Sequence, residues 1–306
     1  MTGKTATPIL VVDLGFSAAK YKFGGLIGRT ASALRRFGDD MIVGDRALDK
    51  SGSNYLKTPA ELVKFYPEFV SHVVELVGVT EKVELSVGLP YAFWKSEKEK
   101  TGTEISAIDQ LKKGLVGENI SKVHVFPQGR GGIVSYLTDS AEVPEGNLLA
   151  IDIGFNTIIA TLWSTDLQKT LWDATYYKKG IHQMATQYLF PKISHHLSGQ
   201  SPTPVEISQC LEKRCLGSGF SKIDIGPDID SCANLYATDT LSDIVADLQA
   251  HVGIAASFSE VLFFGGGTHY LPELNSDTVK MTKLPEPEFA NARGFEVLAQ
   301  NHNKGV

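Results

Sequence analysis

The chain has 306 residues, of which 42% are hydrophobic and 21% charged, and this composition is typical of a globular protein of about two domains rather than a disordered one. Its 29 Lys and Arg against 35 Asp and Glu give a net charge of −6, which disfavours direct binding to nucleic acid because a phosphate backbone needs a concentrated basic surface. The three cysteines contain no CxxC pair, which argues against a disulfide framework and a zinc site, and no apolar run is long enough for a signal peptide or a membrane span. We therefore expect a soluble, cytoplasmic α/β protein that contacts no membrane.

The first predicted elements form a hairpin. Residues 9–12 are short, apolar and β-branched, as in a buried strand, and Asp13-Leu14-Gly15 follows at once. Residues 20–23 alternate like a second strand, so 15–19 should hold the turn between them.

A helix and another strand are expected next. Apolar residues recur at helical spacing over 58–77, with Thr58 as the N-cap and Pro59 at the first helical position. Residues 83–87 alternate as a strand. The charge run 95–100 predicts a solvated helix start or a loop.

The middle of the chain ends one α/β unit and begins another. A strand over 123–126 is stopped by Pro127, and glycine-rich residues lead into a helix near 133–137. Residues 142–147 have the composition of a connector, after which a new buried strand begins at 148–151.

This second start resembles the first. Val12-Asp13-Leu14-Gly15-Phe16-Ser17 aligns with Ile151-Asp152-Ile153-Gly154-Phe155-Asn156, so a strand and its Asp-x-Gly-Phe turn repeat 139 residues later. Internal repetition of such a strand–turn unit predicts two similar α/β halves.

The last part of the chain is predicted to alternate loop, helix and strand. Residues 217–227 favour a loop, and 239–252 have helical periodicity. A central strand over 261–264 opens directly into Gly265-Gly266-Gly267, and 289–300 predict a terminal helix.

The two Asp-x-Gly turns carry the chemistry that is best supported by residue type. A glycine after a buried strand allows a tight turn whose backbone amides can point at phosphate oxygens. Asp13 and Asp152 could hold a hydrated Mg²⁺, which prefers one or two carboxylates together with phosphates and waters. Short donors and one cation accompany them, namely Ser17, Lys20, Asn156 and Thr157. The alternative is that each turn is an ordinary hairpin, and two copies favour the phosphate-binding interpretation.

The three glycines at 265–267 are the second signal. They would let the backbone approach a planar base or an α-phosphate where any Cβ would clash, and the alternative is a flexible loop. The sequence contains neither a GxGxxG fingerprint nor a GxxxxGK[ST] motif, which excludes the Rossmann and P-loop interpretations.

As an ordered set, these stretches resemble the actin/chaperone/sugar-kinase ATPase superfamily, and most of all the ParM-type actin-like proteins of bacteria and archaea that segregate plasmids. The motifs run in the family's order over almost the whole chain: Val12-Asp13-Leu14-Gly15 with Lys20, Val87-Gly88-Leu89-Pro90, Phe126-Pro127-Gln128-Gly129, Leu149-Ala150-Ile151-Asp152-Ile153-Gly154, Phe264-Gly265-Gly266-Gly267 and Phe289-Ala290-Asn291-Ala292-Arg293-Gly294-Phe295.

The resemblance implies an actin-like fold: two duplicated lobes, each with a mixed five-stranded sheet, and a nucleotide cleft between them. The first lobe would span 1–147 with a small insertion subdomain at about 34–58. The second would span 148–288 with a subdomain at about 191–253, and the C-terminal helix at 289–306 would pack back on the first lobe.

The resemblance also assigns roles to residues. Asp13 and Asp152 would be catalytic and would hold Mg²⁺ through water. The nucleotide would contact Gly15, Phe16, Ser17 and Lys20 of the first loop, Gly154, Phe155, Asn156 and Thr157 of the second, Gly180 at a helix start, and Gly265, Gly266, Gly267 and Thr268 of the adenosine loop. The second loop departs from the family's commoner Gly-Thr-Thr type.

Gln128 falls where the superfamily places a side chain that acts on the attacking water. An amide orients a water rather than taking its proton, so we expect water positioning. The alternative is structural, with Gln128 capping the helix that follows it.

The expected function is that of a filament-forming ATPase, with GTP as a possible substrate, that binds an adaptor DNA-binding protein in plasmid partition. The alternative is a small-molecule kinase of the same superfamily, which needs a general-base Asp that the sequence does not supply at an obvious strand end. A nucleotide-sensing module without turnover is a third possibility. A heat-shock-type chaperone is disfavoured because 306 residues leave no room for a peptide-binding domain.

Overall fold

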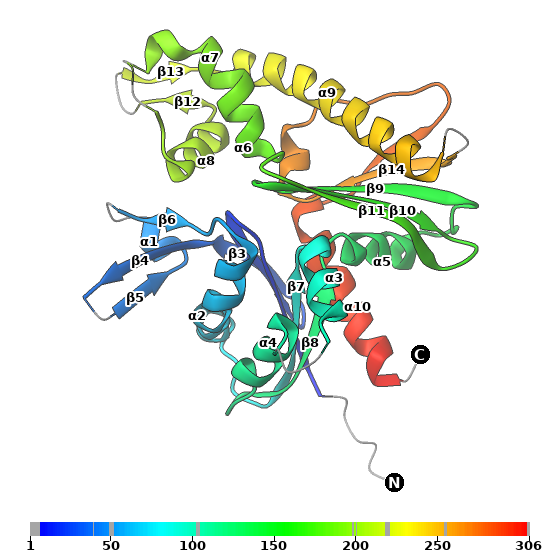
Figure 1. Ribbon diagram of the computed structural model, residues 1–306. Helices are drawn as coiled ribbons and strands as arrows, with labels where there is room; N and C mark the ends of the chain where they lie inside the picture. Colours follow the sequence, from blue (N-terminus) through cyan, green and yellow to red (C-terminus); the bar gives the residue numbers. More distant parts are fainter. Residues whose placement is uncertain are drawn as a thin grey trace. The chain divides into compact units, whose positions relative to one another are not determined.

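The computed structural model describes residues 7–38, 40–48, 52–101, 105–197, 199, 201–217, 221–253 and 256–304 (Figure 1). The chain divides into two compact units. Unit 1 comprises Met1–Ala141 together with Glu288–Val306, and unit 2 comprises Glu142–Pro287.

Unit 1 is centred on a mixed five-stranded sheet with the order β3-β2-β1-β7-β8. Its strands are β1 (Ile9–Leu14), β2 (Ala18–Phe23), β3 (Leu26–Ala31), β7 (Val83–Leu89) and β8 (Ile120–Pro127). The first three strands form an antiparallel meander, whereas β7 and β8 run parallel to β1. The carboxyl ends of β1, β7 and β8 therefore lie at one edge of the sheet.

Unit 2 repeats this topology. Its five-stranded sheet has the order β11-β10-β9-β14-β15, built from β9 (Asn147–Ile153), β10 (Thr157–Ser164), β11 (Lys169–Tyr177), β14 (Glu260–Phe264) and β15 (Lys280–Lys283). Again three antiparallel strands are followed by two parallel ones. The predicted pair of mixed five-stranded sheets is confirmed.

The helices of unit 1 cover its sheet on two faces, and β1 alternates between them. Leu10, Val12 and Leu14 belong to the core that α2 (Pro59–Val77) and α4 (Ala107–Leu115) share, whereas Ile9 and Val11 pack against α10 (Ala290–Lys304). Because side chains alternate along a strand, Asp13 is directed to the same face as Ile9 and Val11. Helices α3 (Tyr91–Glu99) and α5 (Arg130–Asp139) also belong to this unit.

Each unit also carries a smaller group of elements. In unit 1, β4 (Ala33–Phe37), β5 (Asp40–Val43) and β6 (Asn54–Tyr55) form a three-stranded sheet beside α1 (Asp45–Leu48). Unit 2 has α6 (Ile181–Gln183), a π-helical segment (Met184–Leu189), α7 (Phe190–Lys192), a 3₁₀ turn (Ser194–His196), α8 (Pro204–Lys213), the β12 (Cys215–Leu216) and β13 (Ile223–Asp224) pair, and α9 (Gly226–Val252). Residues 39 and 49–51 of the expected first subdomain, and 198, 200 and 218–220 of the second, lie outside the described residues.

The predicted N-terminus of α2 is confirmed. Thr58 is its N-cap and accepts a hydrogen bond from the Glu61 amide at 3.2 Å, and Pro59 occupies the first position, where a missing N–H costs nothing. Gly78 ends the helix in the left-handed region with φ +68°.

Two other element predictions need correction. The charge run 95–100 ends α3 rather than starting a helix, and Glu97 within it is buried because its carboxylate accepts the Ala107 amide at 2.6 Å. The helix expected at 239–252 begins thirteen residues earlier, at Gly226, because Pro227 fits the first turn of a helix as well as it fits a loop.

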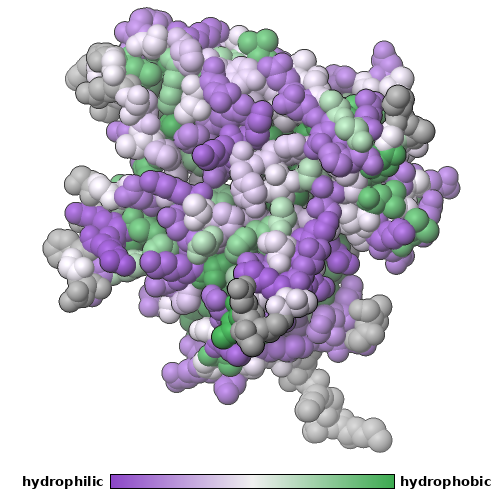
Figure 2. Space-filling view, in the orientation of Figure 1, coloured by the Kyte–Doolittle hydropathy of each residue, from purple (hydrophilic) through white to green (hydrophobic). Residues whose placement is uncertain are grey.

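Figure 2 shows hydrophilic residues over much of the visible face, with hydrophobic ones in small groups between them. Within the described part of the chain, no helix is both long and apolar enough to cross a bilayer.

Helices α5 and α10 cross closely in unit 1 because glycines meet at the crossing. A Cβ on Gly294 would overlap the Gly131 carbonyl, and a Cβ on Gly131 would lie 2.6 Å from the Asn291 carbonyl oxygen. The glycine in the expected terminal motif therefore permits helix packing.

Replacing Gly294 with alanine is expected to destabilise the protein by about 1–3 kcal/mol, the usual cost of overpacking. Thermal melting checks this prediction. Gly114→Ala is the matched control, because Gly114 lies in α4 with open space around its would-be Cβ. That change should raise the melting point slightly, because alanine favours a helix over glycine by roughly 0.5 kcal/mol or more. Equal melting points for the two variants would contradict the proposed packing role.

Candidate functional site

Asp13 is a buried carboxylate near the end of β1. Asp13 is 3% exposed, and it lies opposite Lys20 in the antiparallel pairing of β1 with β2. Its Oδ1 accepts a hydrogen bond of 2.7 Å from Gln128 Nε2. Burial raises the pKa of Asp13 above its usual range, and the Lys20 charge and the Gln128 hydrogen bond only partly oppose that effect. A cation at this carboxylate would stabilise its charged form.

Gln128 is brought to Asp13 from 115 residues away because β8 ends at the same sheet edge as β1. The backbone N–H of Gln128 donates to the Leu89 carbonyl at 2.8 Å, which fixes the backbone of Gln128 beside β7. A charged carboxylate only accepts hydrogen bonds, so the Gln128 side chain must turn its nitrogen to Asp13. This orientation leaves Oε1 as the atom that could accept a hydrogen bond from a water.

The helix after Gln128 is capped by a different residue. Asn291 of α10 accepts the Gly129 and Gly132 amides on its Oδ1 at 3.0 and 3.2 Å, and it is buried. The alternative that Gln128 caps α5 is therefore wrong in this structure. Sequence reasoning missed this role of Asn291, since its partners lie about 160 residues earlier in the chain.

Asn291→Ala is expected to leave two buried amides without an acceptor and to lower stability by about 1–3 kcal/mol. Melting of this variant beside Gln128→Ala checks the assignment of the cap. We expect the larger loss for Asn291→Ala, and a larger loss for Gln128→Ala would restore the capping interpretation of Gln128.

The first turn places Lys20 beside Gly15. The Gly15 amide donates to the Ala18 carbonyl at 3.0 Å, and a Cβ on Gly15 would lie 3.0 Å from Lys20 Nζ. The Lys20 ammonium thus lies close to the backbone of the turn, as a phosphate-binding role requires. Phe16 is buried in the core, so its ring serves packing and only its backbone can face a ligand.

The second turn has the same geometry in unit 2. The Gly154 amide donates to the Thr157 carbonyl at 2.8 Å, which matches the bond from Gly15 to Ala18. Asp152 precedes this turn on β9 and is 7% exposed. Each unit therefore contains one buried Asp followed by a glycine-closed turn, as the sequence repeat predicts.

Gly180 lies directly against the second turn. The amides of Ile181 and His182, at the start of α6, donate to the carbonyls of Gly154 and Phe155 at 3.1 and 2.8 Å. A Cβ on Gly180 would lie 2.5 Å from the Gly154 oxygen, which excludes any larger residue without a shift. Gly180 is the residue before α6, and the start of this helix holds the backbone of the turn.

The glycine loop packs against the end of β9. Gly265 has φ +84°, and a Cβ there would overlap Asp152 Oδ1. Gly267 lies against Ile153, and the buried Thr268 hydroxyl donates to the Phe264 carbonyl at 2.7 Å. Residues Gly266–Tyr270 form a 3₁₀ turn rather than an irregular loop. Packing explains glycine at 265 and 267, and Gly266 is the one that is partly exposed.

The sequence-predicted residues thus gather in two groups, one in each unit. Unit 1 brings together Asp13, Gly15, Phe16, Ser17, Lys20 and Gln128, and unit 2 brings together Asp152, Gly154, Phe155, Asn156, Thr157, Gly180, Gly265, Gly266, Gly267 and Thr268. Among the described residues, no three His, Cys, Asp or Glu side chains gather as a metal cage. The donor that each unit does present, a buried carboxylate, is of the type that Mg²⁺ accepts alongside phosphates and waters.

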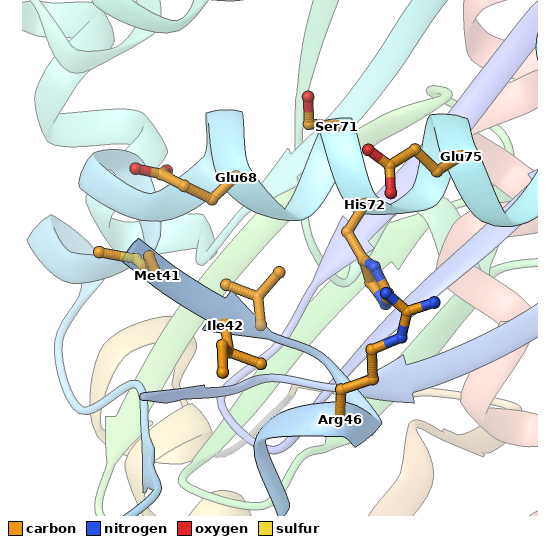
Figure 3. Close-up of a pocket in the computed structure, with 8 residues that line it drawn as sticks. Met41, Ile42, Arg46, Glu68, Ser71, His72 and Glu75 are labelled. Atoms are coloured by element: carbon orange, nitrogen blue, oxygen red, sulfur yellow. The ribbon is translucent and has the colours of Figure 1, made fainter. Parts of the chain in front are cut away.

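Unit 1 also contains a cavity of about 670 Å³ that sequence reasoning missed. The residues that line it come from α2 (Glu68, Ser71, His72 and Glu75), β5 (Met41 and Ile42) and α1 (Arg46), as labelled in Figure 3. Burial lowers the pKa of His72, and the neighbouring Arg46 charge lowers it further. Two carboxylates, one guanidinium and a neutral imidazole make a poor phosphate site, so the nucleotide is not placed here.

Comparisons with solved structures identify the fold. A 15-stranded ParM filament from Clostridium botulinum superposes with TM-score 0.71 at 17% identity, covering 97% of this chain and 100% of that one. The archaeal actin homologue Ta0583 in complex with ADP gives TM-score 0.72 at 16% identity, covering 96% and 99%. MreB 5 of Spiroplasma citri bound to AMPPNP gives 0.69 at 12% identity, covering 99% and 100%.

No family model and no curated protein matches this sequence. The similarity is therefore one of fold, and the chain has the actin-like fold over nearly its whole length. The resemblance to ParM-type actin homologues is confirmed at that level.

Proposed function

We propose that this protein is an actin-like ATPase that binds ATP with Mg²⁺ and assembles into filaments. The observation that carries the proposal is the duplicated turn, in which each unit places a buried Asp before a glycine-closed hairpin. An ordinary hairpin gains nothing from a buried carboxylate, whereas a site for phosphates and a metal does.

The similar structures support this proposal through what they contain. One is a complex with ADP, another is bound to AMPPNP, and a third is a filament. By analogy of fold, this chain would bind a nucleotide, and copies of the chain would associate with one another.

In the proposed mechanism the turns bind phosphates and the carboxylates hold the metal's water shell. Lys20 and the turn amides would neutralise and orient the phosphates, and Asp13 and Asp152 would accept hydrogen bonds from the metal-bound waters. When bound, Mg²⁺ supplies neutralisation of the charge that builds on the transferring phosphoryl group. Gln128, held by Asp13, would present Oε1 to the attacking water and orient it for in-line attack.

The proposal extends to cytoplasmic plasmid partition through an adaptor DNA-binding protein. The net charge of −6 supports an adaptor, because a chain with this charge has no excess of cations for direct contact with DNA. Filaments pelleted with plasmid DNA should accordingly leave the DNA in the supernatant, and DNA in the pellet at physiological salt would contradict this part of the proposal.

Calorimetric titration of the protein with ATP, ADP and GTP, each with and without Mg²⁺, tests the binding step. We expect ATP and ADP to bind and Mg²⁺ to tighten ATP binding, and absence of binding by all three would overturn the proposal. Light scattering on addition of Mg-ATP tests assembly. Soluble turnover that appears only with an added metabolite would instead identify a kinase.

A further inference from the structure

The hydroxyl of Tyr66 lies inside the sheet of unit 1, between β1 and β7. Tyr66 comes from α2, is completely buried, and its Oη lies within hydrogen-bond distance of both strands. The amides of Leu14 and Gly88 each donate to Oη at 3.2 Å. The hydroxyl can donate in turn to the Gly88 carbonyl at 2.8 Å or to the Val12 carbonyl at 3.2 Å.

These four backbone groups are the ones that would pair the next rung of the parallel ladder. The pairing of β1 with β7 runs from Ile9 and Glu84 to Val12 and Val87 and ends there. The next rung would pair Asp13 with Gly88. In that rung the Gly88 amide would donate a hydrogen bond to the Val12 carbonyl, and the Leu14 amide would donate one to the Gly88 carbonyl. The Tyr66 hydroxyl instead occupies the centre of that ring, accepting two hydrogen bonds and donating one, which is its full capacity.

The rung that Tyr66 replaces is the rung that carries Asp13. Asp13 Oδ1 extends over Gly88, where an added Cβ would lie 2.9 Å from that oxygen and 2.5 Å from the Phe295 ring. The direction of the carboxylate therefore depends on how far β1 stands from β7 at this rung. A phenyl ring without the hydroxyl would leave two buried amides unpaired, and the strands would move to satisfy them.

We propose that Tyr66 is a positioning residue for Asp13. Its hydroxyl takes the place of one rung of backbone hydrogen bonds, keeps β1 and β7 apart at that point, and so directs the Asp13 carboxylate toward the metal's water shell. This inference rests on the proposed function of Asp13. Residues of this kind, which orient a metal-binding side chain from behind, commonly change metal affinity or activity by about 10–100-fold when they are altered.

Tyr66→Phe tests the proposal by the Mg²⁺ concentration that half-saturates ATP turnover and by the rise in melting temperature when Mg²⁺ is added to the ADP-loaded protein. We expect the Mg²⁺ requirement to increase about tenfold or more and the Mg²⁺-dependent rise in melting temperature to shrink. Affinity for ADP in EDTA should stay within about twofold, because the turns that bind phosphate are intact.

Phe69→Leu is the matched control, because Phe69 is completely buried on the same helix and the change removes core volume without touching the Tyr66 hydroxyl. It should lower the melting temperature and leave the Mg²⁺ requirement as in the wild type. If Tyr66→Phe does not fold, Gly88→Ala replaces it. The Cβ added on β7 would lie 2.9 Å from Asp13 Oδ1 and would displace that carboxylate. That variant should show the same raised Mg²⁺ requirement.

A wild-type Mg²⁺ requirement in the folded Tyr66→Phe protein, or in Gly88→Ala where Tyr66→Phe does not fold, would overturn the positioning role while leaving the proposed function intact. Equal Mg²⁺ requirements in Tyr66→Phe and Phe69→Leu would overturn it as well. A wild-type protein that neither binds nucleotide nor responds to Mg²⁺ would overturn the proposed function itself, and the inference with it.

Discussion

Asp13→Asn is expected to reduce Mg²⁺-dependent ATP hydrolysis by at least about 10²-fold, while raising the melting temperature of the protein without nucleotide or metal. The loss of rate follows because removing one charged group that stabilises phosphoryl transfer commonly costs that much. The gain in stability follows from burial, which makes the charged carboxylate costly in the empty site. Phosphate release and thermal melting in EDTA measure the two effects.

The pH dependence of stability distinguishes this explanation from simple repacking. Burial raises the pKa of Asp13 in the folded protein above its unfolded value. Below the unfolded pKa the group is protonated in both states and costs nothing, and stability falls as the pH rises through the folded pKa. The stabilising effect of Asp13→Asn should therefore be present at neutral pH and vanish in acid. An equal gain at every pH would contradict it.

Asp152→Asn provides the parallel test in unit 2. The carboxylate there lies against Gly265, and we expect a comparable loss of Mg²⁺-dependent hydrolysis. Unchanged magnesium-dependent turnover in both variants would show that neither carboxylate serves a metal.

Gln128→Ala is expected to bind ATP nearly as well as the wild type, to hydrolyse it about 10²-fold more slowly, and to give longer-lived filaments. The rate falls because an oriented water is lost, and orientation commonly contributes that much or more. Binding persists because Gln128 donates to Asp13 and to the Leu14 carbonyl, at 2.7 and 3.4 Å, and so occupies none of the turn amides that would contact the phosphates. Phosphate release under single-turnover conditions and filament decay after removal of free ATP measure the two effects.

The matched comparison for this variant is Asn291→Ala, which removes the cap of α5 and keeps the Gln128 side chain. We expect it to be less stable than Gln128→Ala but closer to the wild type in turnover. Normal phosphate release from Gln128→Ala together with a lowered melting point would reject the water-positioning role.

The repeat in the sequence was sufficient to predict the topology around the two turns. Asp13 and Asp152 each end a short apolar run of the kind that forms a buried strand, and both side chains are buried in the structure. The contact of Asp13 with Gln128 also follows once β1 and β8 are known to be parallel, because the carboxyl ends of parallel strands share one edge.

Other parts of the site depend on tertiary contacts that no local pattern encodes. Tyr66 has the spacing of an ordinary core residue of an amphipathic helix, and nothing near it in sequence indicates that its hydroxyl enters a sheet. Asn291 caps a helix that lies about 160 residues earlier, and the glycines at 131 and 294 are explained only by a helix crossing. The cavity beside α2 likewise joins three elements without a shared motif.

The most direct test of the central claim is ATP turnover per subunit, measured together with the pelleted fraction over a range of protein concentrations. A filament-forming ATPase should show turnover per subunit that rises steeply above one concentration, at which protein also begins to pellet, with both effects lost in EDTA. Turnover per subunit that stays constant with concentration while all protein remains soluble would contradict the account.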